Sequence, residues 1–258
     1  MFELLKVIVI AIVQGVTEWF PISSDGHLVL LSFLLNYPMS LEFIVALHLG
    51  TLMAVFVYFG KDITDILEDL LRGNWKGQNA RMGFLIAFST IPAAIVGFLL
   101  EKFIESTFSS LFITAIGFGI TSMCLFIASL DLKVENKELS YRNAFLIGIA
   151  QVFAMLPGIS RSGTTISSGL LLGLEEKKAV RFSFLMSIPV IFGAGLLELG
   201  NKELPTSYIL PTFVSFFFGM ITIHLLLKVL SKSRKNLRWF AVYTLLLSIS
   251  IFIFLMFE

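Results

Sequence analysis

QGVTEWFPISSDGH, at residues 14–27, sets a glutamate, a proline, two serines, an aspartate and a histidine between two apolar runs. PGISRSGTT, at residues 157–165, interrupts a second pair of apolar runs in the same way. Proline removes a backbone donor and ends a helix, whereas serine readily caps the start of the next one. Each stretch therefore predicts a helix, a sharp polar turn and a second helix.

Apolar runs of helical length extend from these turns to both ends of the chain. The runs that approach the roughly 20 residues needed to cross a bilayer lie at residues 42–59, 82–100, 110–130, 180–199, 208–230 and 239–257. The shorter runs, paired around the polar turns, lie at residues 4–19 with 26–36 and 142–156 with 162–173. This pattern predicts an all-α integral membrane protein, folded as one polytopic domain over residues 1–258.

The composition agrees with a membrane protein. Of 258 residues, 57% are hydrophobic and 14% are charged, against roughly 25% charged in an ordinary soluble domain. The net charge of +1 gives no overall field that would attract a polyanion, which excludes a nucleic-acid binder. The N-terminal run lacks a small-residue cleavage site and continues into Gln14 and Glu18, so we expect it to stay in the mature protein.

The two polar turns are incompatible with lipid. A charge at the bilayer centre costs at least about 2.5–3.5 kcal/mol. Broken backbone is tolerated at that depth only inside protein or against a water-filled cavity. We therefore predict that each pair of short runs forms a re-entrant hairpin with its polar turn at depth.

The two halves of the chain resemble each other. A shift of 137 residues superimposes Gln14 on Gln151, Ser23 on Ser160 and Gly26 on Gly163. One broken pair followed by three spans also occurs twice, and an odd number of spans inverts the second half. Such repeats carry their site near the midplane. We expect inverted-topology repeats at about residues 1–135 and 136–258, with a single carboxylate site, because Met155 stands where the shift would place a second glutamate.

Lysine and arginine are distributed unevenly between the two faces of the membrane. The count assumes that each hairpin returns to the side from which it enters. The loops near residues 60–81, 131–142, 174–181 and 228–238 carry 15 of the 19, and the opposite face carries 3. The positive-inside rule then places the 60–81 and 231–238 loops in the cytoplasm and both termini outside the plasma membrane. The acidic residues of the 60–81 loop are expected on a solvated or interfacial helix.

The polar residues of the turns form a candidate site. Gln14 and Glu18 are four residues apart and share a helix face. Ser23, Ser24 and Asp25 are suited to cap the helix that follows, as Ser160 is in the second turn. Two helix N-termini and Arg161 would favour a phosphate group, and a nearby carboxylate, histidine and serine would suit its transfer to water.

The residues 14–27 and 157–165 closely resemble the two signature motifs of the bacterial undecaprenyl-diphosphate phosphatases, the bacitracin-resistance (BacA-type) family. The resemblance covers essentially the whole chain. It implies hydrolysis of undecaprenyl diphosphate at the outer face of the plasma membrane. The product, undecaprenyl phosphate, would be recycled as the lipid carrier for peptidoglycan and other envelope polymers. The resemblance also implies a divalent cation, Mg²⁺ or Ca²⁺.

The resemblance assigns roles to individual residues. Glu18 matches the essential acidic residue, Ser24 and His27 match the catalytic serine and histidine, and Arg161 matches the phosphate-binding arginine. Asp25 stands where the family has Thr or Ser. The remaining expected substrate-binding residues are Gln14, Ser23, Ser160, Gly163 and Thr165. Glu18 and Gln14 are also the expected metal ligands.

Several alternatives stay open at this point. The nucleophile is His27, Ser24 with His27 as its base, or water. A polyprenyl-phosphate flippase or transporter would use the same anion cradle without the chemistry of Glu18 and His27. We expect His48 and His224, which lie in ordinary spans, to be packing or interhelical hydrogen-bonding residues.

Small residues suggest where helices approach one another. Gly117 with Gly119, and Gly193 with Gly195, are expected at close helix contacts. A contact between two copies in a homodimer is the alternative for these positions. Membrane lipids and undecaprenyl diphosphate are the other expected partners.

Overall fold

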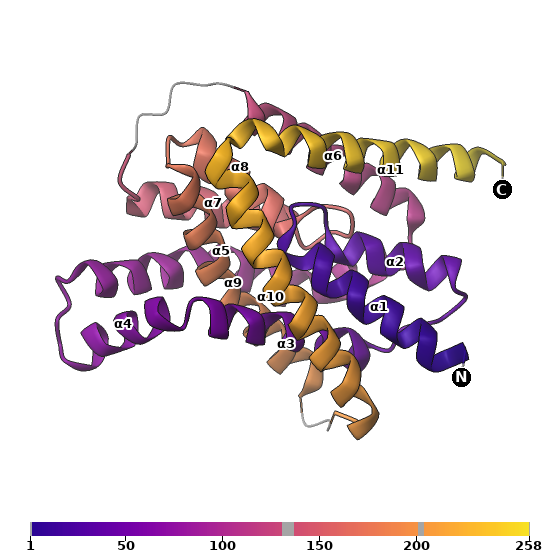
Figure 1. Ribbon diagram of the computed structural model, residues 1–258, viewed down its shortest axis with the longest axis horizontal. Helices are drawn as coiled ribbons and strands as arrows, with labels where there is room; N and C mark the ends of the chain where they lie inside the picture. Colours follow the sequence, from indigo (N-terminus) through magenta and orange to yellow (C-terminus); the bar gives the residue numbers. More distant parts are fainter. Residues whose placement is uncertain (1, 131–136, 201–203, 258) are drawn as a thin grey trace.

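Helices make up all the regular structure in the computed structural model, which describes residues 2–130, 137–200 and 204–257 (Figure 1). In chain order they are α1 (Phe2–Trp19), α2 (Ser24–Leu34), α3 (Leu41–Tyr58), α4 (Gly60–Leu71), α5 (Gln78–Thr107), α6 (Leu111–Ser129), α7 (Tyr141–Phe153), α8 (Arg161–Leu171), α9 (Glu176–Leu199), η1 (Thr206–Tyr208), α10 (Ile209–Lys232), η2 (Arg234–Asn236) and α11 (Leu237–Phe257). No strand occurs in the described ranges.

Six of the described helices are long and apolar enough to cross a membrane. They are α3, α5, α6, α9, α10 and α11, and they coincide with the six runs expected to span. The prediction of an all-α membrane protein is confirmed. The short helix α4 follows α3 and is amphipathic, with one buried residue, Ile66, as expected for the acidic 60–81 loop.

Each polar turn separates two helices as predicted, but α7 already ends at Phe153, three residues before the predicted end of its run at residue 156. The Ser23 side chain caps α2 by accepting a hydrogen bond from the Gly26 amide at 3.2 Å. The Ser160 side chain caps α8 by accepting one from the Gly163 amide at 3.0 Å. The two caps are therefore equivalent under the 137-residue shift. Ser23 has a φ of 68°, a strained value for a residue with a Cβ, and so its turn must be held by its neighbours.

The contacts between helices pair up between the two halves. Helix α5 packs against α7 and α9, and α10 packs against α1 and α3. Helix α6 packs against α11, and α3 packs against α9. Exchanging the halves turns the α5 contacts into the α10 contacts and leaves the α6–α11 and α3–α9 contacts as they are. The inverted repeat itself stays a prediction.

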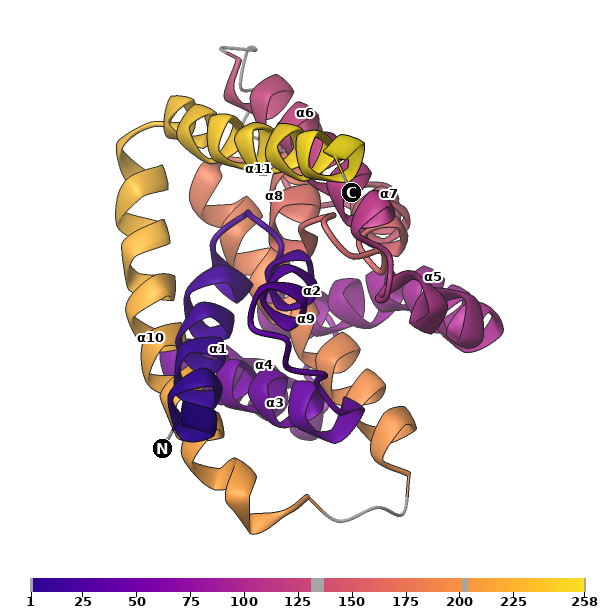
Figure 2. The ribbon, with the colours of Figure 1, turned by 90° about the vertical axis from the view of Figure 1, so that its right-hand side faces the viewer.

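The two ends of the molecule differ. Figure 1 shows both termini at one end and α4 at the other, and Figure 2 looks onto the end with the termini. Near α4, the start of α9 is tied to three other segments by ion pairs. Arg181 pairs with Asp62, Lys178 with Glu138 at 2.7 Å, and Glu176 with Arg234 at 3.8 Å. The Lys178 ammonium lowers the pKa of the exposed Glu138 carboxyl.

Two glycines bring α6 and the second polar turn together. A Cβ on Gly117 would lie 2.3 Å from the Pro157 carbonyl oxygen, and Gly158 has a φ of 89°. The predicted close contact is thus confirmed at Gly117. It is wrong at Gly193, where an added Cβ would meet no described atom within 4 Å, because this side of α9 faces away from the other described helices.

We predict that Gly117→Ala destabilises the protein, because the new methyl group would push against backbone that cannot yield. Overpacking of this kind costs roughly 1–3 kcal/mol, so the midpoint of thermal unfolding in detergent should fall. Gly193→Ala is the matched control and should unfold at the wild-type temperature. Equal midpoints for the two variants would contradict the close approach of α6 to the turn.

Candidate functional site

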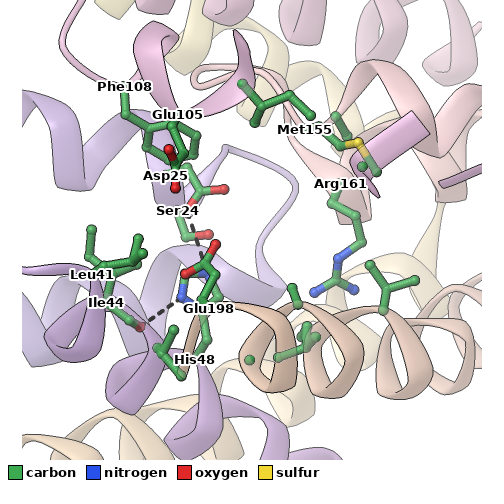
Figure 3. Close-up of a pocket in the computed structure, with 18 of the residues that line it drawn as sticks. Ser24, Asp25, Leu41, Ile44, His48, Glu105, Phe108, Met155, Arg161 and Glu198 are labelled. Carbon is green, nitrogen blue, oxygen red and sulfur yellow. Dashed lines mark hydrogen bonds and ion pairs between the residues drawn. The ribbon is translucent and has the colours of Figure 1, made fainter. Parts of the chain in front are cut away.

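A cavity of about 470 Å³ lies between the two polar turns and helices α3, α5 and α9. Its polar lining consists of Glu18, Ser23, Ser24, Asp25, His48, Glu101, Glu105, Ser160, Arg161 and Glu198. Apolar side chains, including Leu41, Ile44, Phe108 and Met155, line the rest (Figure 3). Such a lining suits a ligand with a charged head and a long apolar chain.

Helix α5 contributes to the cavity through a kink. Leu100 leaves helical geometry, with φ −114° and ψ 17°, and Glu101 and Glu105 line the cavity from the segment beyond it. Figure 3 shows Glu105 and Asp25 of α2 among the side chains that line the cavity. The carboxylates of this region thus come from separate helices and face one space.

Glu18 is the centre of the site and is almost fully buried. One carboxylate oxygen accepts a hydrogen bond from Arg161. The other accepts from the Ser24 hydroxyl at 2.6 Å and from the Gln14 amide at 3.0 Å. The prediction that both polar turns meet in one chamber is therefore confirmed, because the first turn supplies the acid and the second turn supplies the cation.

Arg161 has an N–H group to spare. Its guanidinium stacks over the Trp19 ring at 5.1 Å, which fixes its plane. Its Nη1 is buried and has no hydrogen-bond partner among the described residues. A buried unpaired donor is unfavourable, and Figure 3 shows the side chain pointing into the cavity. The spare N–H is therefore available to an anion bound there.

Ser24 and Glu18 are arranged as a nucleophile and its base. The short hydrogen bond directs the hydroxyl proton at the carboxylate, leaving the lone pairs of the serine oxygen free. Ser24 also begins α2, so the partial positive charge of the helix N-terminus favours negative charge on that oxygen. This pair can therefore attack an electrophile in the cavity.

The structure does not bring His27 into the cavity with them. Its Nδ1 lies 2.6 Å from the Ser23 carbonyl oxygen, and its Nε2 lies 2.7 Å from the Tyr243 hydroxyl. A carbonyl only accepts, so Nδ1 carries a proton and, in the neutral ring, Nε2 accepts from tyrosine. This geometry does not support His27 as the nucleophile or as the base for Ser24. It gives His27 the role of holding the strained backbone at Ser23.

The other predicted residues divide into two groups. Ser23 and Ser160 line the cavity. Gln14, Gly163 and Thr165 lie behind it. The Thr165 hydroxyl donates to the Arg161 carbonyl at 2.8 Å and bonds the Ser183 hydroxyl at 2.6 Å, so it positions α8 and leaves no group for a phosphate.

Sequence reasoning missed His48, which we expected to serve only in packing or between helices. Its Nε2 lies 3.4 Å from both Glu18 and Asp25, and it lines the cavity. One feature of the sequence could have identified His48 as a residue of the site. A histidine within an apolar span is unfavourable unless it faces a cavity or a partner, and Asp25 offered such a partner in the first turn.

The predicted metal ligands, Glu18 and Gln14, do not fit a divalent cation in this arrangement. Both oxygens of Glu18 already accept hydrogen bonds, one of them from the cationic Arg161. Among the described residues, no group of three or more His, Cys, Asp or Glu side chains could hold a metal ion. The described side chains therefore do not by themselves form a binding site for a divalent cation.

The fold and the site together define a polytopic membrane protein with a buried site for an anionic, lipid-linked group. Residues 7–250 match the family model described as bacitracin resistance protein BacA, and the chain belongs to this family. It is 44% identical to an undecaprenyl-diphosphatase of Thermosipho melanesiensis, covering 95% of this chain and 97% of that protein. It is 40% identical to one of Christiangramia forsetii, covering 98% of each, and 38% identical to one of Methanococcus vannielii, covering 96% and 99%.

We predict that Tyr243→Phe lowers stability, because it leaves Nε2 of the buried His27 without its hydrogen bond. The loss of such a bond costs roughly 1 kcal/mol. The midpoint of thermal unfolding in detergent should fall measurably. Tyr58→Phe is the control, since Tyr58 contacts His224 at the longer distance of 3.5 Å. A Tyr243→Phe protein as stable as this control would refute the role given to Tyr243.

Proposed function

We propose that this protein hydrolyses undecaprenyl diphosphate to undecaprenyl phosphate and inorganic phosphate. The observation that carries the proposal is the position of Glu18 between the Ser24 hydroxyl and the Arg161 guanidinium. The relatives named above as undecaprenyl-diphosphatases support the choice of substrate. The apolar part of the cavity suits an isoprenoid chain that leads out into the bilayer.

The geometry supports a reaction through a phosphoserine. The diphosphate binds to the spare N–H of Arg161 and to the N-termini of α2 and α8. Ser24 Oγ attacks the terminal phosphorus and passes its proton to Glu18. The bond from that phosphorus to the bridging oxygen breaks, and undecaprenyl phosphate leaves. Glu18 gives its proton to the departing phosphate and is ionised again. It then takes a proton from water, which attacks the phosphoserine, and it returns that proton to the serine oxygen as inorganic phosphate is released.

A transport function alone would not account for the contact between Glu18 and Ser24. A flippase needs donors for the phosphates, which Arg161 and the helix ends provide. It has no use for a carboxylate that takes the hydroxyl proton of Ser24. We therefore prefer hydrolysis, and no feature of the described residues favours the flippase.

The proposal includes a location and a cellular role. The protein would lie in the plasma membrane with its cavity open to the outer side and the α4 end in the cytoplasm. Its product would return to the synthesis of peptidoglycan and other envelope polymers. A divalent cation, Mg²⁺ or Ca²⁺, would enter as the counterion of the diphosphate, because Mg²⁺ commonly binds through substrate phosphates together with few protein ligands.

We predict that Glu18→Gln lowers phosphate release from undecaprenyl diphosphate by about 10²–10⁴-fold, the range for a lost general base. Ser24→Ala, which removes the nucleophile, should lower it at least as much. Arg161→Lys should lose about 10–100-fold in kcat/KM, because a lysine cannot offer the same planar set of donors. Phosphate release is measured for all three variants on purified protein in detergent, with and without a chelator. A wild-type rate in Glu18→Gln would contradict the proposed mechanism. A wild-type rate that does not change when a chelator is added would contradict the proposed need for a divalent cation.

The orientation gives a separate prediction. In a Cys124→Ser background, we expect Ser109→Cys, in the α5–α6 connection, to react with a membrane-impermeant maleimide on intact cells. Lys76→Cys, in the α4–α5 connection, should react only after the cells are opened. Both positions are exposed, so accessibility is matched. The reverse pattern of labelling would invert the proposed topology.

A further inference from the structure

His48 of α3 lies between two carboxylates, those of Glu18 in α1 and Asp25 in α2. Its Nε2 is 3.4 Å from an oxygen of Glu18 and 3.4 Å from an oxygen of Asp25. Figure 3 shows its ring across the cavity from Arg161. The histidine thus contacts the proposed base without being part of the attack itself.

Hydrogen bonding fixes the form of this ring. Nδ1 lies 2.9 Å from the Ile44 carbonyl oxygen, one turn earlier in α3, and a carbonyl can only accept. Nδ1 therefore carries a hydrogen. Nε2 faces two carboxylate oxygens, which are also acceptors, so a hydrogen on Nε2 satisfies them where a lone pair would repel them. The contacts are consistent with a doubly protonated, cationic ring.

The charges around the cavity show why such a cation is needed. Glu18, Asp25, Glu101, Glu105 and Glu198 line it, and Glu198 interacts electrostatically with both His48 and Asp25. Among the described lining residues, Arg161 and His48 are the two that can carry a positive charge. A diphosphate that enters this space meets Asp25 close to the nucleophile, and the two anions repel each other unless a cation stands between them.

We propose that His48 is a positioning residue for the hydrolysis, and this inference rests on the proposed function. Nδ1 is anchored to the Ile44 carbonyl, which keeps Nε2 at 3.4 Å from the Glu18 oxygen that accepts the Ser24 proton, and the charge of the ring offsets that of Asp25. Glu18 is thereby held in line with the hydroxyl, and the diphosphate is admitted beside an acidic residue. Asp25 and His48 accordingly act as one pair.

A double-mutant cycle on His48 and Asp25 tests the pairing through KM and kcat of phosphate release. His48→Gln keeps a donor but loses the charge, and we expect KM to rise about tenfold or more, as for the loss of a charge-assisted contact. In an Asp25→Asn background, the same change should raise KM less than threefold, because the charge to be offset is gone. An equal rise in both backgrounds would show a merely structural role and overturn the proposal.

Two controls keep the result interpretable. His224→Gln makes the same substitution at another intramembrane histidine, outside the lining of the cavity, and should leave KM and kcat unchanged. Asp25→Asn alone should lower KM, because it removes a negative charge near the diphosphate. A rise in KM above threefold in Asp25→Asn would overturn the pairing even if His48→Gln failed to fold.

Binding of inorganic pyrophosphate separates this inference from the proposed function. We expect wild type to bind pyrophosphate in a calorimetric titration, His48→Gln to bind it at least tenfold more weakly, and the double variant to recover most of the loss. This pattern without hydrolysis of undecaprenyl diphosphate would refute the proposed function, while the pairing of His48 with Asp25 beside a bound diphosphate would stand. Equal binding by wild type and His48→Gln, or no binding by wild type, would refute the role of His48.

Discussion

The ion pair between Glu18 and Arg161 is the interaction on which the site depends. It joins the end of α1 to the start of α8, and both side chains are largely enclosed. Removing two charges from water is expensive, and their attraction offsets the loss only where further hydrogen bonds complete the shell. Ser24 and Gln14 supply those bonds to the Glu18 carboxylate, His48 lies within ion-pair distance of it, and Trp19 stacks on the Arg161 guanidinium. The Glu18 carboxylate and the Arg161 guanidinium thus serve both in the ion pair and in the proposed hydrolysis.

The turns that carry this pair are held by backbone and small residues. Ser23 and Ser160 cap the helices that follow, and His27 and Tyr243 fasten the strained carbonyl of Ser23 from the side of α11. Thr121 supports the second turn by accepting from the Ser160 amide and donating to the Gly158 carbonyl, both at 2.8 Å. Irregular backbone inside a membrane protein requires such internal partners, and here α6 and α11 provide them.

Much of this arrangement could be predicted from the sequence, because a bilayer leaves few options for polar residues. The six spans, the two breaks, and the meeting of Glu18 with Arg161 all follow from the exclusion of charge and broken backbone from lipid. The rotation of each helix about its axis could not be predicted. Helix α3 is apolar nearly all round, so its sequence does not show that His48 faces the cavity. The motif around His27 gives no sign that its ring turns toward α11.

The separation of the two charged residues along the chain has a consequence for biogenesis. Glu18 precedes Arg161 by 143 positions, so α1 and α2 enter the membrane long before the arginine has been synthesised. Until α8 is inserted, the Glu18 carboxylate lacks its cationic partner, and a lone charge inside a membrane is costly. Completion of the second hairpin therefore completes the surroundings of Glu18, and a ribosome-bound nascent chain carries no working site until then.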